Sequence, residues 1–215
     1  MQINKLHEDF DKLQLKYGAK QLNAIYGAGC IKNPNICFVF MNPTEKNVSS
    51  NKKWGGLRAP WIGTKNTWEL LYKLGLFDKK LLKTIKNKKA KEWDYDFSQK
   101  VYTNVEHNKI YITNLSKATQ INARPLKDKD FLNYVDLLKK EIDYVEPKVI
   151  ITFGNQVSSI LLNKKIQVSQ HRKKCFSLKT KKGTYKCFPV YYPVGQGIRN
   201  MDKSIEDILW ILKTK

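Results

Sequence analysis

The chain has 215 residues, 41% of them hydrophobic, which predicts one domain over residues 1–215 with a sizeable core. Its 40 Lys and Arg residues against 19 Asp and Glu residues give a formal net charge of +21. This charge indicates a polyanionic partner, or else a composition biased toward lysine. No run approaches the roughly 18 apolar residues of a membrane span, and the N-terminus lacks a signal-peptide core. We therefore expect a soluble, cytoplasmic monomer without a membrane partner.

The central feature of the sequence is an apolar run, residues 36–41, with the length and bulk of a buried strand. The run stops at Asn42-Pro43, and a long loop with a Gly-Gly pair and an aromatic corner at Trp61 follows. A polar residue at the carboxyl end of a buried strand is typical of the mouth of an open α/β sheet, where ligands bind. Trp61 also suits a plain core position.

A second buried-type run, residues 109–113, again ends on an asparagine, Asn114. If the two strands are parallel, Asn42 and Asn114 converge on one crevice. A simple turn role for Asn114 stays open on this evidence alone.

The remaining pattern alternates strands and helices. We expect helices within 3–26 and over 66–74, 128–146, 156–162 and from about 202, a strand over 149–154, and a hairpin over 173–192. Thr64 or Asn66 is the expected cap of the second helix. The alternation predicts a three-layer α/β/α domain around a mainly parallel, four-stranded sheet.

Residues 79–91 carry seven lysines, with Leu81, Leu82 and Ile85 forming one apolar side. Such a segment is either a solvated helix face or a contact surface for phosphates.

The four cysteines, at positions 30, 37, 175 and 187, form two distant pairs without a Cys-x-x-Cys spacing. Cys37 lies in the apolar run, where a thiol behaves as a small hydrophobe, and an intracellular setting disfavours disulfides. We expect free or structural thiols and no metal.

Five blocks in this order resemble the uracil-DNA glycosylase superfamily over about residues 23–201. They are FVFMNPT (38–44), APWIG (59–63), KIYITNLSKATQINARPL (109–126), VIITFGNQVSSILL (149–162) and YYPVGQGIRN (191–200). The closest branch, family 4-like, usually binds a 4Fe-4S cluster through four cysteines, one directly after the lysine of the third block. Here that place is Ala118, and the cysteines present do not repeat that spacing, so at this departure from the branch we predict no cluster, and we expect no other cofactor.

The resemblance implies a function and roles for individual residues. The protein would flip a deaminated base, uracil above all, out of DNA and hydrolyse its N-glycosidic bond. Trp61 would stack on the base, and the Asn114 amide would pair with O4 and N3–H of uracil. Asn42 would orient the water, and a backbone N–H near Met41 would add a donor.

Tyr192 stands where this superfamily commonly has histidine, and its O–H would donate to the base O2 as charge builds. Its alternative role is to end an edge strand. The loop after it supplies Gln196, Ile198 and Arg199 as DNA contacts, with Ile198 and Arg199 as the wedge that fills the emptied stack. The resemblance also makes Lys117 and Arg124 phosphate contacts, although surface charge explains them too.

Other functions stay open. Tyr192 in place of histidine favours a catalytically weak or inactive damaged-DNA-binding protein of the same fold. A glycosylase for another deaminated base, such as hypoxanthine, is a further alternative. A nucleotide-metabolising α/β enzyme is disfavoured because no GxGxxG or Walker-type loop follows any strand.

Overall fold

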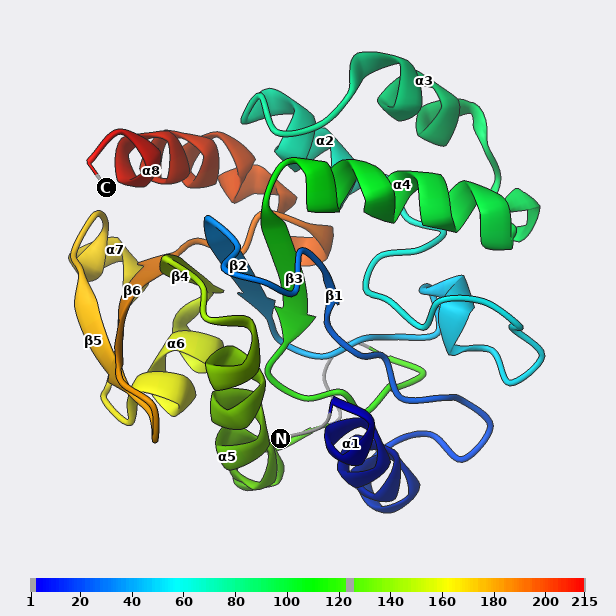
Figure 1. The fold of residues 1–215 in the computed structure, drawn as a ribbon. Coiled ribbons are helices and arrows are strands. Elements are labelled where there is room, and N and C mark those ends of the chain that lie inside the picture. The colour runs from blue at the N-terminus through cyan, green and yellow to red at the C-terminus, as the bar shows by residue number, and fades with distance from the viewer. Residues whose placement is uncertain (1–2, 123–125, 215) are drawn as a thin grey trace.

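The computed structural model describes residues 3–122 and 126–214. Its centre is one six-stranded sheet in the order β1-β3-β2-β4-β6-β5 (Figure 1). The inner strands β3, β2, β4 and β6 are parallel, and β1 and β5 pair antiparallel at the two edges. The strands are β1 (Ala28–Gly29), β2 (Ile36–Phe40), β3 (Ile110–Asn114), β4 (Val149–Phe153), β5 (Phe176–Lys179) and β6 (Thr184–Val190).

The expected four-stranded parallel sheet is therefore present, with one short strand added at each edge. Every residue of β2, β3 and β4 is buried. Strands covered on both faces have no solvent side, which is why they appear in the sequence as continuous apolar runs.

Helices cover both faces of the sheet, as the α/β/α prediction requires. They are α1 (Ile3–Tyr17), α2 (Asn66–Lys73), α3 (Lys79–Asn87), α4 (Tyr95–His107), α5 (Asp128–Val145), α6 (Asn155–Leu162), α7 (Val168–His171) and α8 (Met201–Lys213). Phe38 and its even-numbered neighbours in β2 share a core cluster with residues of α2, α3, α4 and α8. Val39 and Cys37 face the other way, into a cluster with α5 and α6.

Some local expectations need correction. Helix α2 begins after Lys65, and neither Thr64 nor Asn66 caps it through a side chain. The helix expected within residues 3–26 is α1, which ends at Tyr17. Helix α4 was not expected from the sequence. Of the helices in the described ranges, none has the length and apolar composition needed to cross a bilayer.

Candidate active site

One large cavity, of about 940 Å³, opens at the carboxyl ends of the four parallel strands. The residues that end or follow these strands line it: Asn42 after β2, Asn114 at the end of β3, Gly154 after β4 and Tyr192 after β6. Parallel strands bring their carboxyl ends to the same edge of a sheet, so these residues meet although they are far apart in sequence. The predicted convergence of Asn42 and Asn114 is confirmed.

Backbone hydrogen bonds hold the two asparagine loops side by side. Phe40 is the register partner of Asn114 in the parallel ladder. Beyond the ladder, the Leu115 N–H donates to the Phe40 carbonyl at 2.7 Å, and the Ser116 N–H donates to the Met41 carbonyl at 3.0 Å. The strand exits therefore continue as a paired loop, which fixes the backbone of both asparagines.

The Asn42 side chain presents an acceptor to the cavity. Asn42 is 6% exposed, and its Nδ2 donates to the Pro43 carbonyl at 3.0 Å. The buried Oδ1 has no hydrogen-bond partner among the described residues. A buried polar atom without a partner is costly, and a water or substrate in the cavity would satisfy it.

The Asn114 side chain presents a donor to the same cavity. The residue is 2% exposed, and its buried Nδ2 lacks a partner in the described part of the chain. Both asparagines line the one cavity, and each has a buried amide atom without a partner among the described residues, an acceptor in Asn42 and a donor in Asn114. This pairing suits a polar ligand with its own donors and acceptors.

A buried ion pair lies behind Asn114. The Lys117 Nζ donates to the Asn114 carbonyl at 2.6 Å, to Thr113 Oγ1 at 2.7 Å and to Glu141 Oε2 at 2.6 Å. The other carboxylate oxygen, Oε1, accepts from Tyr111 O–H at 2.8 Å and Thr113 O–H at 3.0 Å. Burial lowers the pKa of Lys117, and the adjacent Glu141 opposes that shift.

The prediction that Lys117 binds phosphate is wrong. Its side chain is 0% exposed, and its three acceptors use the three N–H donors of the ammonium. Lys117 instead fixes the backbone carbonyl of the residue expected to read the base. The other phosphate candidate of this loop, Arg124, lies outside the described residues.

Trp61 combines the core and the cavity roles. Its ring packs edge-on against Phe40, with centroids 4.8 Å apart, and it also lines the cavity. Its φ of 66° is unusual for a non-glycine residue. The Trp61 carbonyl accepts from Thr64 Oγ1 at 2.8 Å and from Trp68 Nε1 at 3.3 Å, which holds this conformation. Its own buried Nε1 has no partner among the described residues.

Tyr192 follows the end of β6, and its ring packs against Phe40 at the end of β2. The two rings meet edge-on with centroids 6.0 Å apart, and Tyr192 lines the cavity. Burial raises the pKa of its phenol well above the ordinary value, so the group stays protonated and can donate. Among the described residues, no hydrogen bond engages its hydroxyl.

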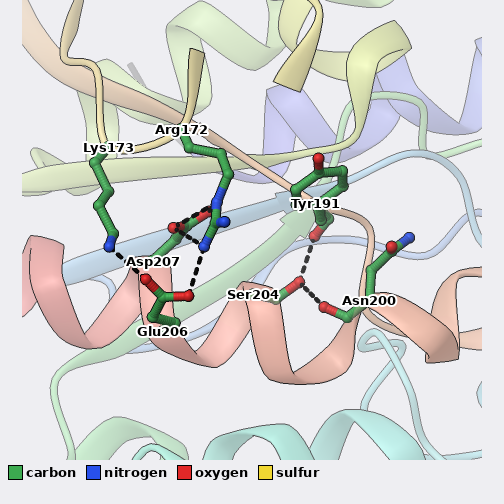
Figure 2. Close-up of polar contacts among 7 residues, drawn as sticks. All are labelled: Arg172, Lys173, Tyr191, Asn200, Ser204, Glu206 and Asp207. Carbon is green, nitrogen blue, oxygen red and sulfur yellow. Dashed lines mark hydrogen bonds and ion pairs between the residues drawn. The ribbon is translucent and has the colours of Figure 1, made fainter. Parts of the chain in front are cut away.

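Helix α8 and the α7 turn fix the segment that carries Tyr192 (Figure 2). Ser204 Oγ lies 2.9 Å from both the Tyr191 and the Asn200 carbonyls, so it ties the two ends of the loop. Arg172 donates to both carboxylate oxygens of the fully buried Asp207 and, at 2.7 Å, to Glu206 Oε2. The Ser204 contacts hold the loop against α8, and the Arg172 contacts join the end of α7 to the same helix.

The loop after Tyr192 reaches the cavity in part. Gln196 and Arg199 line it, whereas Ile198 is 47% exposed outside it. At Gly197 an added Cβ would lie 2.1 Å from the Tyr192 carbonyl oxygen, so this close approach requires glycine. That Gln196, Ile198 and Arg199 contact DNA remains a prediction.

Several lining residues were not expected from the sequence. Met41 lines the cavity beside Asn42, as expected. Lys46, Lys65 and the buried Thr67 also line it, although the sequence did not indicate them. The side chain of Phe153, stacked on Phe40 at 4.4 Å, forms part of the same lining. Phe153 ends β4 and was recognisable by the strand-end argument, while the loop lysines carried no such signal.

The donor set does not suit an iron–sulfur cluster or another bound metal. Position 118 is alanine, and the cysteines at positions 30, 37, 175 and 187 are all free. Within the described ranges, no three His, Cys, Asp or Glu side chains gather where they could hold an ion. The expected free thiols are confirmed.

Comparison with known proteins adds a family to this geometry. The search of curated proteins found no match. A family model for the uracil DNA glycosylase superfamily matches residues 26–209, which includes all four parallel strands and every strand-end residue of the cavity. The chain therefore belongs to the uracil DNA glycosylase superfamily.

Proposed function

We propose that the protein is a monofunctional DNA glycosylase that flips a deaminated base, uracil first of all, into this cavity and hydrolyses its N-glycosidic bond. Superfamily membership supports a DNA glycosylase-type function with DNA as the partner. The observation that carries the finer proposal is the pair of buried, unsatisfied amide atoms of Asn42 and Asn114 in one cavity with aromatic rings.

The cavity matches the chemistry of a flipped uracil. The free Nδ2 of Asn114 is a donor suited to O4, and its Oδ1 is an acceptor suited to N3–H. Cytosine offers an amino donor in place of O4 and a bare N3, so the same amide orientation mismatches it. Trp61 offers aromatic surface for stacking, which recovers part of the cost of unstacking the base.

The lining residues indicate how the bond would break. None of those in the described ranges is an aspartate, glutamate or histidine, so no ordinary general base faces the cavity. Asn42 Oδ1 orients a water by accepting its hydrogen bond. The glycosidic electrons leave with the base, Tyr192 O–H stabilises the charge on it, and the water oxygen bonds to the sugar carbon. One proton of the water stays on the new hydroxyl of the sugar carbon, and the other neutralises the departed base directly or through solvent, leaving an abasic site.

The lack of an aspartate, glutamate or histidine among the described lining residues favours one alternative, a protein that binds damaged DNA without cleaving it. Neutral amides and a tyrosine can hold a flipped base even if they fail to release it. A glycosylase for hypoxanthine is a variant of the main proposal, since its O6 and N1–H present the same acceptor and donor order as uracil O4 and N3–H.

End-labelled duplexes that contain uracil, hypoxanthine or no lesion separate these functions. After incubation, half of each sample is treated with alkali, and a parallel sample is run on a native gel. A monofunctional glycosylase gives strand breaks only after alkali, and we expect them with uracil. A lesion-dependent gel shift without alkali-labile sites would overturn hydrolysis in favour of binding. Asn42→Ala protein, purified identically, controls for contaminating activity.

A further inference from the structure

A second groove, with Leu81 among its lining residues, lies away from the cavity. It has a volume of about 500 Å³ and lies between α3 and α4, which Figure 1 shows on the same side of the sheet. Its lining includes two lysines and several polar side chains from both helices: Lys80, Lys100, His107, Thr84, Thr103 and Asn104. Asp78 lines it too, but its Oδ1 accepts from the Leu81 N–H at 2.7 Å and caps α3.

The lysines of α3 are placed as a contact surface. Leu82 and Ile85 are buried in the core, which turns Lys79, Lys80 and Lys83 outward, and all three are exposed. None of them has an ion pair in the described part of the chain. Lysines three and four positions apart on a helix repel one another, so this face is unfavourable for the isolated helix. A bound polyanion removes that repulsion.

Helix α3 also connects this groove with the rim of the large cavity. Lys65, which lines the cavity, donates to the Lys86 carbonyl in the last turn of α3 at 2.5 Å. The nine residues of α3 rise about 1.5 Å each, so the helix extends roughly 13 Å from that rim. One base pair of duplex rises about 3.4 Å, and the helix thus spans about four base pairs.

We propose that the α3–α4 groove, together with the exposed lysines of α3, is a contact surface for the sugar–phosphate backbone of the duplex that flanks the flipped base. This inference rests on the proposed function, because it takes DNA as the substrate. Lysine ammonium groups bind phosphate oxygens as point charges, and the threonine and asparagine side chains add hydrogen bonds without reading sequence. The surface therefore adds affinity for any duplex, damaged or not.

The test compares two triple variants with equal loss of charge. Lys80→Gln, Lys83→Gln and Lys100→Gln together remove the two lysines that line the groove and one exposed lysine of α3 beside it. Lys179→Gln, Lys181→Gln and Lys186→Gln are the control: all three positions are exposed, at or near the β5–β6 turn, at the opposite end of the sheet from the cavity. Fluorescence anisotropy with an undamaged 30-base-pair duplex gives Kd from 50 to 200 mM salt.

We expect the groove variant to bind at least about tenfold more weakly at 50 mM salt. Its slope of log K against log salt should be smaller by about 2 to 3, because each lost phosphate contact removes about 0.9. The Kd of the control variant should stay within about twofold of the wild-type value. Replacing Lys80, Lys83 and Lys100 by arginine should retain binding because the charge remains. Equal Kd and slope for the groove and control variants would overturn the proposal.

Failure of this proposal differs from failure of the proposed function. Binding to undamaged duplex needs no base release. If the Kd depends on the groove lysines but the protein releases no base, the groove proposal stands and the glycosylase proposal fails. If the wild type releases the base but the Kd does not depend on the groove lysines, the glycosylase proposal stands and the groove proposal fails. At saturating DNA, the single-turnover rate of the groove variant should equal that of wild type, because none of its three positions lines the cavity.

Discussion

Replacing Lys117 by methionine tests whether the buried ion pair supports Asn114. The substitution keeps an apolar stem but removes the ammonium that contacts Asn114, Thr113 and Glu141 within 2.7 Å. Glu141, 2% exposed, would keep only the Tyr111 and Thr113 hydroxyls as donors. Breaking a buried pair from one side costs about 3 to 5 kcal/mol, a large part of the 5 to 15 kcal/mol of a typical domain.

A second substitution separates the buried charge from the lost contact. Glu141→Gln in the Lys117→Met background removes the unpaired charge, so urea denaturation should show most of the lost stability restored. The double variant still lacks the donor to the Asn114 carbonyl. We expect its base release to stay roughly tenfold below wild type while its affinity for undamaged DNA is unchanged. The reasoning is refuted if Lys117→Met costs less than about 1 kcal/mol, or if the double variant is fully active.

Three further predictions follow from individual side chains. Asn42→Ala should cut single-turnover base release at least about tenfold with little change in DNA affinity, because the residue positions water; equal rates would remove it from the mechanism. Tyr192→Phe should slow base release by about tenfold or more. The wild-type rate should show no change near pH 10 from ionisation of Tyr192, because burial raises the pKa of this phenol. A change near pH 10 that is absent in Tyr192→Phe would contradict this pH prediction. Burial lowers the pKa of His7, stacked on Tyr26, below 6.5. Unfolding therefore takes up a proton below pH 6.5, so stability falls as pH drops through that region, and urea midpoints of His7→Gln should lose this component.

The sequence allowed the sheet centre and the cavity floor to be predicted for a physical reason. Strands β2, β3 and β4 are buried on both faces, so their residues are mainly apolar, and the asparagine that ends or follows β2 and β3 is conspicuous. Asn42 and Asn114 were found in this way.

Other features depended on contacts that no local pattern reveals. The resemblance makes Lys117 a phosphate contact, and no local pattern indicates its burial, because lysine is ordinarily exposed and its partner Glu141 is 24 residues away on α5. Helix α4 was missed although Ser98, Val101, Tyr102 and Val105 have helical spacing, since serine and tyrosine obscure the apolar stripe. The two-residue strand β1 is too short to carry any periodicity.

The central claim is that the Asn114 side chain reads the base, and Asn114→Asp tests it most directly. An ionised aspartate offers two acceptors, which repel uracil O4 but accept from the N4 amino group of cytosine. The measurement is the single-turnover release of uracil and of cytosine from otherwise identical duplexes by wild type and variant. The account predicts a shift of preference toward cytosine of about 1 to 3 kcal/mol, the value of one good edge contact. An unchanged preference for uracil at the wild-type rate would contradict it and leave Asn114 as no more than the end of β3.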